Sequence, residues 1–304
     1  MPLATFGFGT SNILKYFESK YQEQINQKQY IIIKKLSIMK SEKNVVAGLG
    51  EIGNPILKLF SKYDLVVGYD VNPKLMNNKK FERVSALDTS FLHICIPFGG
   101  KFVKSVTSLI KKFDPECAVI HSTIKPFTTK KIQELSQIPI IYSPVRGVHK
   151  RMLYDLIRYT KFYAIENHAP RLKWASSNYS KFLKRCGIKT KKLSSPVTLE
   201  LGKIICDTSY YGWLINYAQL SNMIAINHKV NYDEMWLFAD EIHRYLGNRP
   251  KMFPGIIGGH CVIPNLDLMH NQTLNLIKKM NYIYARQVKN AKTIDKKYLR
   301  KSNR

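Results

Sequence analysis

Residues 44–53 read Asn-Val-Val-Ala-Gly-Leu-Gly-Glu-Ile-Gly, a short apolar run that leads into three glycines spaced G-x-G-x-x-G. The run has the length of a buried strand, and residues 55–63 then carry apolar side chains at helical spacing. Gly48 permits a tight turn, Gly50 lets a ligand approach the backbone, and Gly53 permits close packing of helix on strand. The stretch therefore predicts a strand, a phosphate-binding turn and a helix in succession.

A carboxylate suited to a dinucleotide follows this turn. Asp70 ends the next apolar run, residues 65–69, and stands twenty residues beyond Gly50. There it would accept the hydroxyls of an adenosine ribose and repel a 2′-phosphate, so the predicted cofactor is NAD rather than NADP. N–H groups at the start of the helix, around Glu51, Ile52 and the third glycine, are expected to bind the pyrophosphate. The strand–turn–helix context disfavours the alternative of an ordinary glycine-rich turn.

The rest of the first half alternates apolar runs with amphipathic stretches. The further runs that we interpret as strands are residues 91–97, 118–122 and 138–142. Such alternation indicates βαβ units around a parallel sheet, so the predicted fold class is α/β, with a Rossmann-type doubly wound sheet.

The second half has helical spacing only. The expected helices are residues 198–228, 232–246 with Asn231 as N-cap, and 266–284. The predicted organisation has four segments: an N-terminal extension of no assigned role (1–40), a Rossmann domain (41–190), a smaller all-helical domain (191–285) and a basic tail (286–304).

Charge and hydropathy limit the classes of partner. Lys and Arg number 48 against 21 Asp and Glu, a net charge of +27, but the basic residues are scattered along the chain. Scattered charge favours a solvated surface over a dedicated patch, so nucleic acid is disfavoured as a partner. No apolar stretch approaches the roughly 18 to 20 residues of a membrane span, and none is expected.

The five cysteines include no C-x-x-C pair. This argues against a disulfide framework and against a structural metal site, and it predicts a reducing, cytoplasmic setting. Cys95, Cys117 and Cys206 lie in apolar segments and are expected to be buried. Cys261 lies instead in the sequence Pro-Gly-Ile-Ile-Gly-Gly-His-Cys-Val-Ile-Pro, residues 254–264. A thiol at the head of a helix is predicted to be a nucleophile.

Two more motifs precede this thiol loop (residues 254–261). A strand ends in Ser122-Thr123, and Glu200-Leu-Gly-Lys203 opens the long helical stretch. With the glycine motif, they make the chain resemble the UDP-glucose/GDP-mannose dehydrogenase family over roughly residues 44–270. The resemblance is greatest to its UDP-N-acetylmannosamine dehydrogenase branch, whose P-G-x-G-G-H-C motif appears here with one extra residue between the glycines.

The resemblance implies oxidation of a nucleotide-sugar alcohol to a carboxylate with two NAD, through a thiohemiacetal and a thioester on Cys261. It implies that Lys203 stabilises the developing oxyanion, and that Thr123 lies beside the nicotinamide or the reactive carbon. It also implies a homodimer formed through the helical domain. The residues that it places near the substrate are Asp207, Gly258, Gly259, His260 and Asn265.

Three positions depart from the family pattern. Val145 replaces the glutamate of a Ser-Pro-Glu segment that helps to handle water, Asp207 replaces an asparagine, and Asn265 replaces an aspartate. The chain ends at Arg304, so we expect the family's C-terminal nucleotide-sugar-binding domain to be lacking. These departures leave open whether the last, hydrolytic step is impaired.

Two other functions stay open. A two-electron hydroxy-acid or alcohol dehydrogenase has the same layout, and it would form one NADH per substrate instead of two. A non-catalytic NAD-binding or nucleic-acid-binding homologue would suit the charge of +27. Steeply salt-dependent binding of nucleic acid would support the latter.

Overall fold

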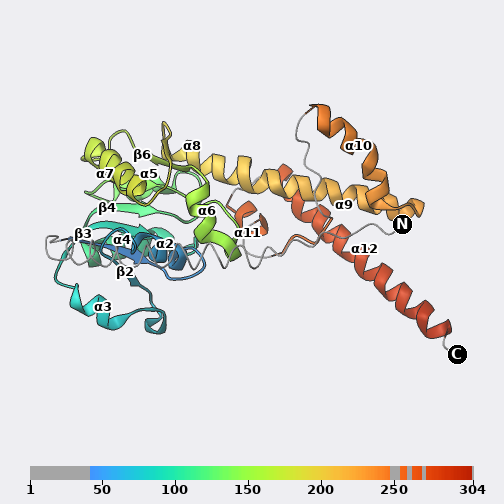
Figure 1. The fold of residues 1–304 in the computed structure, drawn as a ribbon, viewed down its shortest axis with the longest axis horizontal. Coiled ribbons are helices and arrows are strands. Elements are labelled where there is room, and N and C mark those ends of the chain that lie inside the picture. The colour runs from blue at the N-terminus through green and yellow to red at the C-terminus, as the bar shows by residue number, and fades with distance from the viewer. Residues whose placement is uncertain (1–41, 247–253, 259–261, 269–271, 303–304) are drawn as a thin grey trace, which may run out of the picture. The chain divides into compact units, whose positions relative to one another are not determined.

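The computed structural model describes residues 42–246, 254–258, 262–268 and 272–302, drawn as a coloured ribbon in Figure 1. These residues divide into two compact units. Unit 1 holds residues 42–122 and 129–195, and unit 2 holds residues 123–128 and those from 196 onward. The four segments expected from the sequence stay a prediction.

Unit 1 contains a seven-stranded sheet in the order β2-β1-β3-β4-β5-β6-β7. Strands β1 to β5 are parallel to one another, and β6 is antiparallel to β5. The predicted α/β, doubly wound fold is thereby confirmed. Two strands were not predicted, because β6 begins with a lysine and β7 reads Thr-Lys-Lys. The strands are β1 (Glu42–Ala47), β2 (Val66–Tyr69), β3 (Asp88–Ile94), β4 (Pro115–Ile120), β5 (Ile140–Tyr142), β6 (Lys161–Ile165) and β7 (Thr190–Lys192).

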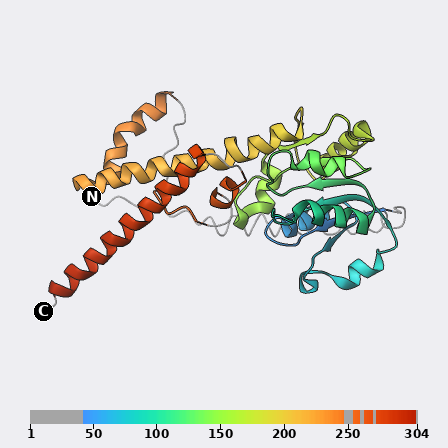
Figure 2. The same cartoon turned by 180° about the vertical axis from the view of Figure 1, so that it is seen from behind.

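Helices flank this sheet, as the two opposite views in Figures 1 and 2 show. Among them, α2 follows the glycine motif directly and packs against α6 as well as against β1 and β2. The helices are α2 (Gly53–Phe60), α3 (Asn78–Arg83), α4 (Phe102–Phe113), α5 (Thr128–Glu134), α6 (Met152–Arg158) and α7 (Leu172–Arg185), with short 3-10 turns η1 (Pro73–Leu75) and η2 (His149–Arg151).

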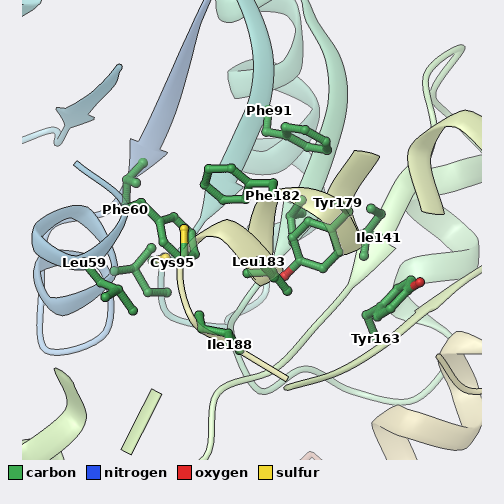
Figure 3. Close-up of a cluster of buried hydrophobic side chains, with 14 of the residues drawn as sticks. Leu59, Phe60, Phe91, Cys95, Ile141, Tyr163, Tyr179, Phe182, Leu183 and Ile188 are labelled. Carbon is green, nitrogen blue, oxygen red and sulfur yellow. The ribbon is translucent and has the colours of Figure 1, made fainter. Parts of the chain in front are cut away.

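Aromatic side chains form much of the core of unit 1 (Figure 3). Phe60 of α2 and Phe182 of α7 are buried, with ring centroids 4.8 Å apart and planes 80° apart. Phe91 of β3 stacks on Phe182 at 6.1 Å. Such pairs each add about 0.5–1.5 kcal/mol beyond the burial of their area. The cluster therefore holds α2, and the glycine loop before it, against the sheet.

The described secondary structure of unit 2 consists of helices. The predicted helix over 198–228 is continuous, but it contains a π-helical segment, η3, in which N–H groups bond to carbonyls five residues back. The Asn231 cap is confirmed, because its Oδ1 accepts the Glu234 N–H at 3.0 Å. The elements are α8 (Pro196–Leu201), η3 (Gly202–Ser209), α9 (Tyr210–His228), α10 (Tyr232–Leu246), α11 (Val262–Leu266) and α12 (Gln272–Ser302).

The last helix is longer than predicted. The expected helix ended at Tyr284 and a basic tail followed, whereas α12 runs through that tail to Ser302. Residues 285–302 contain Ala, Lys, Arg and Gln, which favour helix, and neither Gly nor Pro. Within the described ranges, no helix combines the length and the apolar character that crossing a membrane requires.

Candidate active site

The glycine loop, residues 48–53, follows β1, an interior strand next to the edge strand β2, and Ala47 at its end pairs with both β2 and β3. Gly48 has a φ of 90°, and a Cβ there would stand 2.9 Å from the backbone carbon of Cys95. A Cβ on Gly53 would stand 1.7 Å from the carbonyl oxygen of Gly48. Packing within the protein therefore requires glycine at both positions.

Gly50 differs from these two glycines. It is exposed, and no atom of another described residue, its two chain neighbours aside, lies within 4 Å of the place its Cβ would take. A Cβ there would fill space before the start of α2, where a phosphate can approach free N–H groups. Ile52 packs against the core and Glu51 is exposed in the same turn. These residues fit the pyrophosphate of a dinucleotide.

Asp70 directly follows β2, and its carboxylate has two partners in the protein. Oδ2 accepts the Leu49 N–H at 2.7 Å, and Oδ1 accepts the Asn72 N–H at 2.8 Å. A carboxylate has about four lone-pair sites, so each oxygen retains capacity for a ribose hydroxyl. The Leu49 bond also ties the glycine loop to the end of β2, a role that the sequence interpretation missed.

The two predicted polar residues of η3 contact each other. Lys203 Nζ lies 2.5 Å from Asp207 Oδ2, and the two side chains are 12% and 45% exposed respectively. A mostly buried ammonium thus has a carboxylate that fixes its position. This ion pair lies within a π-helical segment, a type of turn that occurs frequently at functional sites.

Thr123 belongs to the same unit as Lys203, and the residues after it are held by the start of the helical stretch. The buried carboxylate of Glu200 accepts the Phe127 N–H at 2.6 Å. Phe127 has a φ of 68°, a backbone region that favours glycine, and its side chain is 61% exposed. The glutamate of the Glu200-Leu-Gly-Lys203 motif therefore anchors the 123–128 segment.

The thiol loop is described in part. Gly259, His260 and Cys261 lie outside the described residues, so their predicted roles stay predictions. Gly258 is exposed, and within the described ranges nothing beyond its chain neighbours comes within 4 Å of the position of its Cβ. Helix α11 begins at Val262, directly after the cysteine in the sequence.

Helix α11 carries Asn265, the residue that replaces the family's aspartate. Asn265 is half buried on it. Asp267, two residues further on, forms an ion pair with Lys278 of α12. The pairing gives Asp267 a structural partner and leaves Asn265 as the residue at the predicted position.

The remaining cysteines separate into two kinds. Burial raises the pKa of Cys95 and of Cys186 to about 12, and it raises the pKa of Cys117 well above its usual value. The expectation that Cys206 is buried was wrong, because it is exposed. The apolar residues of η3 lie on two faces of the helix. Ile204 lies on the buried face, and Cys206 does not.

Val145, which departs from the family's glutamate, is a core residue of unit 1. It is 7% exposed and belongs to the apolar cluster shown in part in Figure 3. A carboxylate at this position would lose its hydration without a designed partner. The structure thus explains why valine is tolerated here.

A buried histidine pair lies under the strand ends and was missed in the sequence. His93 Nδ1 is 3.0 Å from His121 Nε2, and His121 Nδ1 is 3.0 Å from the Ser143 carbonyl oxygen. A carbonyl only accepts, so His121 Nδ1 carries a proton and its Nε2 accepts the His93 Nδ1–H. Burial, with Lys161 nearby, lowers the pKa of His93 to about 3 and that of His121 well below its usual value. The only signal for this pair was a histidine within each of two apolar strands.

The structure divides the predicted site residues between the two units. Unit 1 holds the predicted cofactor residues of the glycine loop and β2: Gly48, Gly50, Glu51, Ile52, Gly53 and Asp70. Unit 2 holds the other predicted residues that the structure describes: Thr123, Lys203, Asp207, Gly258 and Asn265.

No protein-family model matches the chain, and no curated protein matches it. Solved structures do. UDP-D-ManNAc dehydrogenase from Pyrococcus horikoshii matches with a TM-score of 0.65 and 20% identity, over 86% of this chain and 72% of that one. UDP-N-acetyl-mannosamine dehydrogenase Cap5O from Staphylococcus aureus gives 0.64 and 22%, over 84% and 71%. The 3-hydroxyisobutyrate dehydrogenase of Mycobacterium tuberculosis gives 0.57 and 15%, over 80% and 92%. The chain therefore has the fold of these dehydrogenases.

Proposed function

We propose that the protein is a dehydrogenase that uses NAD to oxidise the alcohol of a nucleotide sugar. The glycine loop carries this proposal. Packing demands glycine at positions 48 and 53, whereas Gly50 opens onto space at the start of α2, as an approaching pyrophosphate would need. Two proteins that share the fold are named for UDP-N-acetylmannosamine, the substrate class that the thiol-loop motif implies.

NAD, when bound, would supply a nicotinamide that accepts hydride from the alcohol carbon. Asp70 would accept ribose hydroxyls with the lone pairs that Leu49 and Asn72 leave available. The N–H groups around Glu51 and Ile52 would bind the pyrophosphate. Thr123 would lie beside the reacting carbon, as the motif resemblance implies.

The chain's own chemistry would centre on Cys261 and Lys203. The thiolate would add to the carbonyl carbon of the aldehyde, and the Lys203 ammonium, held by Asp207, would stabilise the oxyanion of that adduct. Loss of a second hydride from that adduct to a second NAD would leave a thioester, which water would cleave to the carboxylate and the free thiol. Val145 supplies no base for that water, so hydrolysis is the slow step that we expect.

Besides the substrate, the proposed partner of the chain is a second copy of itself. Helix α9 carries apolar side chains all around its circumference, and several of them are exposed. An exposed apolar stretch of this extent is typical of a protein interface. A homodimer through α9 is therefore part of the proposal, and light scattering after size exclusion tests it against the Leu220→Lys variant. The large apolar residues exposed on α9 are Tyr210, Tyr211, Trp213, Tyr217, Leu220, Ile224 and Ile226.

A second candidate is a two-electron hydroxy-acid dehydrogenase. The 3-hydroxyisobutyrate dehydrogenase shares the fold over 92% of its own chain, and a lysine held by a carboxylate suits that chemistry as well. In this case Cys261 would have no covalent role, and one NADH would form per substrate.

One experiment separates the two candidates: NADH formation measured with UDP-sugars, GDP-sugars and 3-hydroxy acids, using the wild type, Cys261→Ser and Lys203→Met. We expect two NADH per nucleotide sugar, with a burst followed by a slow phase, and a sugar adduct visible by intact-protein mass spectrometry. Both variants should lose at least about 100-fold in rate. Cys206→Ser and Lys279→Met, which change exposed residues, are the matched controls. One NADH per hydroxy acid with an active Cys261→Ser would support the second candidate.

A further inference from the structure

The segment that leads to Cys261 is bonded by side chains from two helices of unit 2. Residues 254–258 have no regular secondary structure, yet Ile257 is buried in an apolar cluster with Leu266 and Ile277. Irregular backbone that is partly buried must find hydrogen-bond partners outside a helix or sheet. Here the partners are Gln219 of α9 and Asn281 and Tyr284 of α12, which we call the amide clamp.

Asn281 makes the central contacts of the amide clamp. Its Oδ1 accepts the Ile257 N–H at 2.8 Å, and its Nδ2 donates to the Ile257 carbonyl oxygen at 3.1 Å. The same Oδ1 accepts Gln219 Nε2 at 3.1 Å. The opposite orientation of the amide would set donors against donors, so the network itself fixes how Asn281 is oriented.

The other two residues bond the positions before Ile257. Gln219, fully buried, donates to the Gly255 carbonyl oxygen at 2.8 Å and accepts Asn216 Nδ2 at 2.8 Å. The Tyr284 hydroxyl donates to the Pro254 carbonyl oxygen at 2.5 Å and accepts from Asn222 at 3.1 Å. Three side chains thus hold four backbone groups of a five-residue segment.

We propose that Asn281, with Gln219 and Tyr284, is a positioning residue that sets the backbone of residues 254–258 before substrate binds, and that the reactivity of the Cys261 thiol depends on it. The inference rests on the proposed function for the role of Cys261. It goes beyond that function by assigning the conformation of residues 254–258 to side chains on helices that are distant in the sequence. Preorganisation of this kind spares the reaction the cost of ordering the loop.

The test uses the full chain with three variants and one control, and none of its main readouts needs a substrate. Asn281→Ala removes both bonds to Ile257, Asn281→Asp keeps the acceptor for its N–H, and Tyr284→Phe removes a single hydroxyl. Asn275→Ala changes an exposed asparagine on the same helix and is the control. Amide hydrogen exchange of the 254–258 segment, whose N–H groups are those of residues 255–258, measures the clamp. Iodoacetamide labelling between pH 6 and 9 measures the thiol.

We expect Asn281→Ala to speed exchange in this segment and to change the labelling rate of Cys261 by about 3- to 10-fold, the worth of one or two hydrogen bonds. Exposed Cys206 in the same sample is the internal reference and should not change. Asn281→Asp should lie between Asn281→Ala and the wild type, and Tyr284→Phe, which keeps its ring in place, should show the smaller effect of one bond.

Two results would overturn the proposal. One is faster exchange in residues 254–258 with an unchanged labelling rate and pH profile at Cys261, which makes the clamp purely structural. The other is unchanged exchange in both Asn281→Ala and Tyr284→Phe. If no nucleotide sugar yields NADH, the proposed function fails, but these readouts still decide whether the clamp controls the thiol.

Discussion

The glycine loop of unit 1 and the 254–258 segment of unit 2 are both irregular backbone next to predicted chemistry, and they are held by different means. The glycine loop is held by steric fit, since a single methyl group at Gly53 would collide with the Gly48 carbonyl oxygen. The 254–258 segment is held by hydrogen bonds from Gln219, Asn281 and Tyr284. The glycine loop has no room for a side chain at Gly48 or Gly53, whereas the 254–258 segment depends on hydrogen-bond donors and acceptors.

The difference bears on how each loop can respond to a ligand. Close-packed backbone has no alternative arrangement nearby, so the glycine loop offers a rigid surface to a cofactor. Hydrogen bonds from side chains can exchange for water at a net cost of about 0.5–1.5 kcal/mol each. Substitutions in the amide clamp should therefore change the reactivity of the thiol gradually instead of abolishing the fold.

The largest effect is expected from Gly53→Ala. The new methyl group would stand 1.7 Å from the Gly48 oxygen, so the loop or α2 must move. We expect a loss of about 3 kcal/mol or more in the free energy of unfolding, measured with urea. Gly50→Ala is the matched change in open space. It should alter stability by less than about 1 kcal/mol and should weaken NAD in calorimetric titration. Equal destabilisation by both variants would contradict the steric account of the loop.

The second effect is a pH dependence confined to unit 1. Burial lowers the pKa of His93 to about 3, below the ordinary value of 6.5, so between these values the unfolded chain binds the proton and the folded chain does not. The contribution of the histidine pair to the free energy of unfolding is therefore complete above pH 6.5 and is lost as the pH falls toward 3. We expect a loss of up to about 1.4 kcal/mol per pH unit for each histidine.

Urea unfolding at pH 7.5, 6.5, 5.5 and 4.5 checks this dependence. His93→Phe, placed among Phe60, Phe91 and Phe182, should reduce the slope, and His228→Phe on an exposed position of α9 should not. A slope that is the same in all three proteins would show that other groups control acid unfolding.

The fold and the glycine loop could be predicted because their determinants lie within a few residues of one another. Gly48, Gly53 and Asp70 follow directly from the turn, the helix start and the strand end. The amide clamp could not be predicted, since Gln219 and Asn281 lie 36 and 24 positions from the residues that they bond. Contacts of this kind exist only once the helices are packed.

The histidine pair and η3 were missed for two further reasons. His93 and His121 meet because β3 and β4 pair in one register, with His93 opposite Val119, and spacing along one chain does not fix that register. Within a helix, apolar periodicity does not distinguish bonds four residues back from bonds five residues back. This is why Cys206 was assigned to the wrong face.

A smaller effect is expected at Asp70, whose carboxylate serves both the loop and the proposed ribose. Asp70→Ala should lower the affinity for NAD about 10-fold and reduce the ratio of NAD affinity to NADP affinity. The reason is that the substitution removes both a hydrogen-bond acceptor and a charge that repels the 2′-phosphate. Asp70→Asn keeps an oxygen for one of the two backbone N–H groups. It should therefore also reduce the preference for NAD over NADP, but with a smaller loss of NAD affinity than Asp70→Ala. Calorimetry with both cofactors measures this, and Asp88→Asn, at an exposed strand start, is the control. Unchanged affinities in both Asp70 variants would remove Asp70 from the cofactor site.

The smallest effect concerns Phe127, where unit 2 holds left-handed backbone without a glycine. A φ of 68° destabilises a residue that has a Cβ by about 1 kcal/mol. The Phe127 ring is 61% exposed, so its packing offsets little of this strain. Phe127→Gly should therefore raise the free energy of unfolding by up to about 1 kcal/mol, while Phe127→Ala, which keeps a Cβ, should not.

A double-mutant cycle with Glu200→Gln then tests what holds this turn. The Glu200 carboxylate accepts the Phe127 N–H at 2.6 Å, and an amide in its place accepts more weakly. If the carboxylate compensates for a conformation that only glycine adopts freely, Glu200→Gln should cost about 0.5 kcal/mol less in the Phe127→Gly background than in the wild type. Additive effects would mean that Glu200 stabilises unit 2 independently of the backbone at Phe127. In that case residues 254–258 would differ from the glycine loop in being held by hydrogen bonds from side chains. Residues 123–128 would not share that property.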